Sequence, residues 1–109
     1  MFTLDDRKNL EAEVKAEMAR HGLRRWKFKW NRKVRQYGLC CHDSKTIWLS
    51  WSLIQHNEYE IFREALLHEI AHARVGPGHG HGARWEAEAR AVGSAATTTI
   101  KGRLVSAKY

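Results

Sequence analysis

The chain has 109 residues, of which 43% are hydrophobic and 28% charged. This length is sufficient for one packed domain with a single core. No apolar run is long enough to cross a membrane, and the N-terminus is too polar for a secretory signal, so we expect a cytoplasmic protein without a membrane partner. The formal net charge is +7, and residues 20–35 carry the whole excess, with eight Lys or Arg and no acid.

The first predicted element is a helix over residues 4–21. Thr3 and Asp6 have the spacing of a capping box, and apolar residues then recur at every fourth position from Leu10 to Met18. The dipeptide His21-Gly22 provides a stop signal for this helix.

Three extended segments follow. Trp26, Phe28 and Trp30 alternate with basic residues, which predicts a strand whose aromatic side chains face the core. Residues 35–42 and the stretch Ile47–Trp51 alternate in the same way, and residues suited to turns separate the three segments. We therefore predict a short antiparallel three-stranded sheet, a meander with one apolar face.

From about Glu58 the apolar period becomes helical. Gly76-Pro77-Gly78 should end this helix, and a further helix is predicted over residues 82–92. The tail, residues 94–109, is small and polar, and its order is left open. The fold class is α+β, with residues 1–109 forming a single domain.

His68, Glu69 and His72 form the pattern H-E-x-x-H in the middle of this helix. Residues four apart share one helix face, so both imidazoles can bind one zinc ion, while Glu69 is placed to act on a water molecule. The pattern also occurs by chance on exposed helices. Here its flanking residues are apolar, and buried polar groups without a partner would be costly, which favours a metal site.

The third zinc ligand is not fixed by spacing. His79 and His81 both follow the glycine-rich turn, and either could fold back to the first two histidines. The metzincin pattern requires Gly and then His at the positions that Val75 and Gly78 occupy, so it does not apply.

Four short elements occur in a particular order, namely Gly38-Leu39-Cys40, then Ile47-x-Leu49-Ser50 with Leu53, then Leu67-His68-Glu69-Ile70-Ala71-His72, then His81-Gly82-x-x-Trp85. In this combination the stretch from about Arg35 to Gly93 resembles the SprT-like family of zinc metallopeptidases, which includes Spartan and related DNA–protein crosslink proteases. The H-G-x-x-W element is the most specific of the four.

The resemblance implies a small zincin-like domain, in which the catalytic helix packs on a short sheet. It also implies one zinc ion per chain, held by His68, His72 and His81, with His79 left in the loop. The chain departs from many bacterial members, which carry a C-terminal zinc ribbon, because no cysteine follows Cys41.

The basic segment has a second candidate role, in binding nucleic acid through its interactions with phosphates. We predict this role for Arg24, Arg25, Lys27, Lys29, Arg32, Lys33 and Arg35. The alternative is that these residues are only the solvated face of a strand.

The leading functional hypothesis is a monomeric zinc endopeptidase that cleaves proteins held on DNA, single-stranded DNA included, with Glu69 as the general base. The alternative is a zinc-stabilised nucleic-acid-binding module with little or no proteolytic activity, although a purely structural site has no use for Glu69. A metal-dependent nuclease is less favoured, since such sites usually gather several carboxylates around two metal ions.

Overall fold

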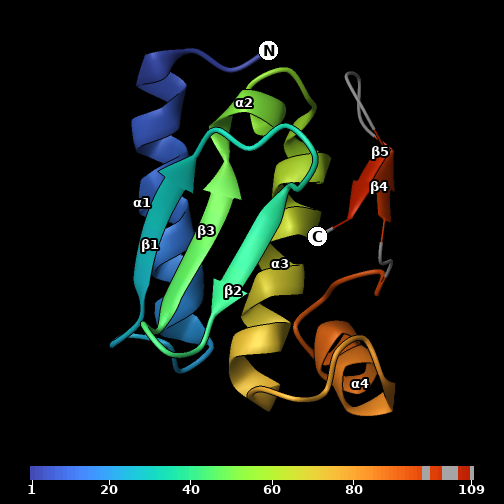
Figure 1. Cartoon of the computed structure of the whole chain (residues 1–109). Helices are drawn as coiled ribbons and strands as arrows, with labels where there is room; N and C mark the ends of the chain where they lie inside the picture. Colours follow the sequence, from blue (N-terminus) through green and yellow to red (C-terminus); the bar gives the residue numbers. More distant parts are fainter. Residues whose placement is uncertain (97–98, 102–105, 109) are drawn as a thin grey trace.

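A computed structural model of the chain describes residues 1–96, 99–101 and 106–108. The elements in chain order are α1 (Leu4–Arg20), β1 (Lys27–Asn31), β2 (Gly38–Cys41), β3 (Thr46–Ser50), α2 (Trp51–Ile54), α3 (Tyr59–Val75), α4 (Ala83–Ala91), β4 (Thr99–Lys101) and β5 (Ser106–Lys108). Figure 1 shows the sheet β1–β3 in front of α1 and α3, with α4 beside the end of α3. The predicted α+β class is confirmed. None of the described helices is long and apolar enough to span a membrane.

The helix α1 forms where the sequence predicts it. The Thr3 backbone N–H donates to Asp6 Oδ2 at 2.8 Å, and the Asp6 N–H donates to Thr3 Oγ1 at 3.1 Å, so the capping box is present. Leu10, Val14 and Met18 are buried on the face that packs into the core. The apolar period therefore identified the buried face of this helix.

The predicted antiparallel meander is wrong. The strand order is β1-β3-β2, in which β1 runs parallel to β3 and only β2 runs antiparallel to it. Residues 32–37 carry the chain past β3 to its far side, and the Ser50 N–H donates to the Tyr37 carbonyl where they arrive. The central strand is β3, in which Ile47 and Leu49 are fully buried. Alternation identifies which side chains face the core and carries no information about which strands pair.

A second correction concerns Trp51, which the alternation places at the end of the third strand. It instead begins α2, because the Ser50 hydroxyl accepts a hydrogen bond from the Leu53 N–H at 3.2 Å and caps the new helix. Trp51 is still buried, and its ring and that of Trp30 meet edge to face at a centroid distance of 5.2 Å.

Both later helices are also confirmed to within one or two residues. The helix α3 ends at Gly76, whose φ of +87° is a conformation that favours glycine. The helix α4 packs against α3 through a small cluster of Ala71, Trp85 and Ala89. The part of the predicted tail that is described contains β4 and β5, which pair antiparallel, and the remaining positions 97–98, 102–105 and 109 lie outside the described residues.

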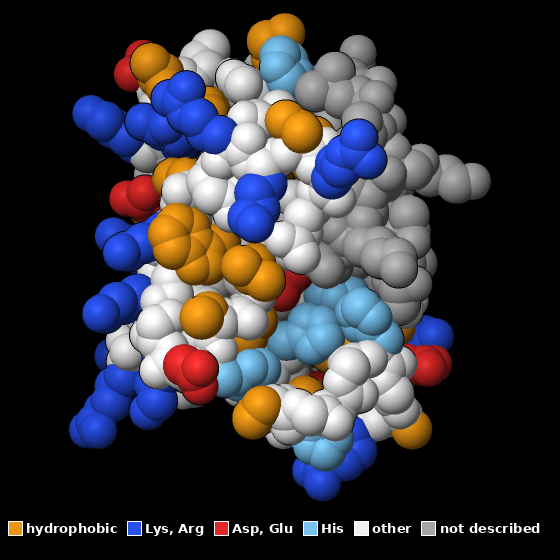
Figure 2. Space-filling view, in the orientation of Figure 1, with side chains coloured by type: hydrophobic (Ala, Val, Ile, Leu, Met, Phe, Trp, Pro, Cys, Tyr) orange, Lys and Arg blue, Asp and Glu red, His pale blue; other side chains and the backbone are white. Residues whose placement is uncertain are grey.

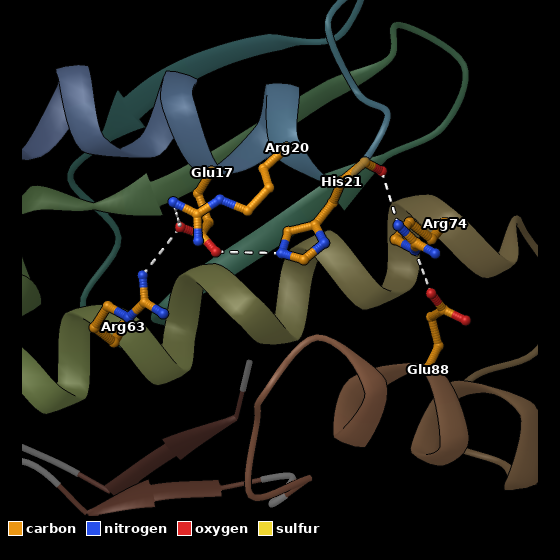
Figure 3. Close-up of polar contacts among 6 residues, drawn as sticks. All are labelled: Glu17, Arg20, His21, Arg63, Arg74 and Glu88. Atoms are coloured by element: carbon orange, nitrogen blue, oxygen red, sulfur yellow. Dashed lines mark hydrogen bonds and ion pairs between the residues drawn. The ribbon is translucent and has the colours of Figure 1, made fainter.

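A buried carboxylate ties α1 to α3 (Figure 3). Arg63 of α3 donates to Glu17 of α1 at 3.2 Å, and His21 Nε2 lies 3.2 Å from the other carboxylate oxygen. Burial alone would raise the pKa of Glu17, but the hydrogen bond and charge of Arg63, with His21 and Arg20, lower it below its ordinary value. The network therefore stabilises the fold above that ordinary pKa, and the contribution is lost as the pH falls through the lowered value.

A second set of polar interactions joins the end of α1 to α4 through α3. Arg74 of α3 donates to the His21 carbonyl at 3.0 Å and pairs with Glu88 of α4 (Figure 3). Three helices are thus held together around the last turns of α3, where His72 lies.

Candidate metal centre

The C-terminal half of α3 carries His68, Glu69 and His72. His68 is fully buried, Glu69 is 1% exposed and His72 is half-buried. The apolar neighbours that the sequence placed around them, Leu66 and Ile70 among them, are fully buried. The pattern therefore lies on a core helix and is not a solvated surface.

His68, His72 and His81 direct their Nε2 atoms at one point. The distances are 2.9 Å between His68 and His81, 3.1 Å between His68 and His72, and 3.2 Å between His72 and His81. Zinc–nitrogen bonds of about 2.0–2.1 Å in a tetrahedral site imply about 3.3 Å between ligand nitrogens. Three imidazoles in this arrangement form a donor set that fits a single transition-metal ion. Among the described residues, these three histidines are the group found to have the geometry of a metal site.

The glycine-rich turn brings His81 back to α3. Gly76, Gly78 and Gly80 have φ values of +87°, +88° and +52°, so this reversal uses the left-handed conformation three times in five residues. His79 is half-buried in the same turn and is not part of the histidine cluster. The structure therefore separates two residues that spacing alone left equivalent.

Trp85 of α4 supports all three histidines from behind. Its ring centroid lies 4.5 Å from that of His68, 5.5 Å from that of His72 and 4.8 Å from that of His81. Its indole N–H points to the His68 carbonyl at 3.4 Å. Trp85 is 1% exposed, so its ring is held in place by packing and restricts the orientation of the imidazoles.

Glu69 lies against the backbone of β2 beside the cluster. A β-carbon on Gly38 would come within 2.7 Å of Glu69 Oε2 and 2.8 Å of its Cγ, so only glycine leaves room for this carboxylate. Glu69 Oε2 is buried and has no hydrogen-bond partner among the described residues. The carboxylate and His72 line one small cavity of about 140 Å³, with Leu39 at its side.

Burial sets the protonation of the site. It raises the pKa of Glu69 to about 8, and it lowers the pKa of His72 to about 4, with the charges of His81 and His42 adding to the second effect. A neutral imidazole is the form that binds a metal ion, so His72 can act as a ligand at neutral pH.

Burial also raises the pKa of the Cys40 thiol to about 12, and the charges of Glu69 and Cys41 add to this effect, so this free cysteine is not a nucleophile.

Sequence reasoning missed His42, which lines the same cavity. Its Nε2 lies 2.9 Å from the His72 carbonyl oxygen, across thirty positions of sequence. His42 stands in the turn after β2, and nothing in the local pattern marks it as a neighbour of α3.

The seven Lys and Arg residues of the basic segment that are predicted to bind nucleic acid are all exposed, whereas Trp26, Phe28 and Trp30 are half-buried and pack against the core. The alternation therefore assigned the two faces of β1 correctly. Figure 2 shows Lys and Arg side chains along the side where β1 runs and across the upper part of the same face, and histidines gathered in its lower part.

Taken together, these features define the class as an α+β protein whose core helix carries a candidate three-histidine metal site with a buried glutamate beside it. In a comparison with known families, residues 7–104 match the SprT-like family, and the chain belongs to that family. The match extends the resemblance seen between Arg35 and Gly93 over nearly the whole chain. No curated protein and no solved structure matched the chain in the corresponding searches.

The geometry gives a direct test of the third ligand. His81→Ala should lose tight metal binding, because two imidazoles remain where three converge, whereas His79→Ala should keep about one metal ion per chain. Metal content after dialysis, measured by elemental analysis, separates the two variants. A full complement of metal in His81→Ala would show that His81 is not a ligand.

Proposed function

We propose that the chain is a zinc-dependent endopeptidase and that its substrates are proteins associated with DNA. The observation that carries the proposal is the convergence of three histidine Nε2 atoms beside a buried glutamate whose Oε2 has no hydrogen-bond partner among the described residues. Membership of the SprT-like family supports a metallopeptidase of this kind.

His68, His72 and His81 would hold the metal ion. A bound zinc ion supplies Lewis acidity, which lowers the pKa of a water molecule and polarises a peptide carbonyl. The Glu69 carboxylate would take the proton of the attacking water and transfer it to the amine that leaves when the peptide bond breaks. Burial raises the pKa of Glu69 in the metal-free chain, and the charge of a bound metal ion would lower it again and favour the carboxylate form that accepts the proton.

The choice of DNA-associated substrates rests on the basic segment. Its seven Lys and Arg side chains are exposed and no acidic residue interrupts them. Such a surface would hold the protein on a phosphate backbone through counterion release, and the cleavage site would then lie within reach of neighbouring proteins.

The competing function is a zinc-stabilised nucleic-acid-binding module without proteolysis. The buried Glu69 oxygen speaks against it, because a structural site gains nothing from a buried carboxylate oxygen that no hydrogen bond satisfies. The test is metal analysis combined with cleavage of an unfolded protein substrate, with and without single-stranded DNA. Full zinc content with no cleavage under either condition would favour the binding module.

The DNA part of the proposal has its own test. Replacing Lys27, Lys29, Arg32 and Lys33 with Gln should weaken DNA binding and flatten its salt dependence, by about one unit of slope for each phosphate that is no longer neutralised. All four side chains are exposed, so the zinc content and the fold should not change. Fluorescence anisotropy over a salt series measures both the affinity and the slope.

A control removes positive charge from elsewhere on the surface. The control residues are Lys8, Arg84 and Arg90, which are exposed and lie outside the basic segment. If the two variants weaken DNA binding equally for each charge removed, net charge and not the basic segment governs binding. If both bind as wild type does, the segment is only a solvated face.

A further inference from the structure

We propose that His42 is a positioning residue that holds the metal ligand His72 in place through its backbone. The inference rests on the proposed function, since it assigns a role around the same metal centre. It concerns the hydrogen bond that joins the turn after β2 to the last turn of α3, in which His42 Nε2 approaches the His72 carbonyl oxygen to 2.9 Å.

The hydrogen bond has a defined direction. A carbonyl oxygen can only accept, so His42 Nε2 carries the hydrogen and donates it. The same oxygen also accepts the Gly76 N–H at 3.2 Å, which is the last bond of the helix. Carbonyls beyond this point have no helical partner, so His72 lies where the helix begins to lose its own support.

His42 is itself fixed by the sheet. The Lys45 N–H donates to the His42 carbonyl at 3.2 Å and closes the turn, and the Lys27 N–H of β1 donates to the Lys45 carbonyl at 2.8 Å. The Trp26 and His42 rings meet edge to face at a centroid distance of 5.9 Å. The imidazole therefore connects a rigid part of the sheet to the ligand-bearing turn of α3.

His72 needs this support more than His68, the other proposed ligand on α3. His68 is fully buried, and the Trp85 indole approaches its carbonyl, whereas His72 is half-buried and is followed by the glycine-rich turn. Arg74 also ties this turn to the end of α1 and to α4, so removing the bond from His42 would loosen the backbone at His72 without unfolding the turn, and the three imidazoles would converge less often. Loss of an interaction that orients a metal ligand typically weakens metal binding by about tenfold to a hundredfold.

The test compares two substitutions of His42 whose amide side chains differ in length. The side-chain nitrogen of His42→Gln lies near the position of Nε2 and can donate to the His72 carbonyl, whereas that of His42→Asn is one methylene too short. We expect His42→Asn to bind Zn²⁺ about tenfold more weakly than wild type in a chelator competition, and His42→Gln to recover most of the affinity. The visible spectrum of bound Co²⁺ should change in His42→Asn and be near that of wild type in His42→Gln.

Two further measurements separate positioning from general stability. Denaturant unfolding of the metal-free variants should give the same stability for Gln and Asn at position 42, and His56→Ala, a histidine away from the site, should bind Zn²⁺ as wild type does. Equal Zn²⁺ affinity in His42→Asn, His42→Gln and wild type would overturn the positioning role, and so would equal weakening in both variants. A wild-type chain that binds no Zn²⁺ would instead overturn the proposed function.

Discussion

Replacing Glu69 with Gln should reduce peptide hydrolysis by roughly a hundredfold to ten-thousandfold, because Gln matches Glu in size but cannot take a proton from water. Metal content should stay at that of wild type, since the three imidazole ligands are unchanged. The fold should also be kept, because Glu69 is 1% exposed and an uncharged group of the same shape fits that space. Cleavage of an unfolded protein substrate, followed by gel and by mass spectrometry, measures the effect.

A chemically matched control is Glu60→Gln, which makes the same change at an exposed position of α3 and should leave cleavage unaffected. Wild-type activity in Glu69→Gln would show that Glu69 is not the base. A large loss of metal in that variant would mean that the carboxylate contributes to binding and not only to proton transfer.

Replacing Trp85 with Ala should destabilise the protein by about 3–5 kcal/mol, the usual cost of removing a large buried aromatic side chain. Trp85 is 1% exposed and its ring packs against all three histidines, so the variant should also bind metal more weakly. Denaturant unfolding of the metal-free protein gives the first quantity, and a chelator competition gives the second.

Trp48→Ala provides the matched change on the outer face of the sheet. Trp48 is half-buried and lies beneath the Lys29 ammonium at 5.6 Å from its ring centroid, so its loss should cost about 1 kcal/mol or less and leave metal affinity unchanged. If Trp85→Ala were no less stable than Trp48→Ala, the packing of α4 on α3 would contribute little to the site.

Several parts of this protein follow from the sequence alone because they depend on neighbours along the chain. The capping box at Thr3 and Asp6 and the stop at Gly76 are local, and so is the period that buries one face of α3. The pairing of His68 with His72 follows from helix geometry, in which residues four apart share a face. The alternation along β1 likewise separated half-buried aromatic residues from exposed basic ones.

Only the tertiary structure decided the features that depend on which segments meet. The period of a strand does not say what it pairs with, so the parallel pairing of β1 with β3 could not be predicted. Spacing left His79 and His81 equivalent, and only the family resemblance pointed to His81; in the structure, three glycines with positive φ bring His81 to the cluster. The requirement for glycine at Gly38 and the bond from His42 to His72 both arise where β2 packs on α3, across about thirty residues of chain. Such interactions are fixed by the packing of the whole core, because each depends on the positions of two elements that no local pattern relates.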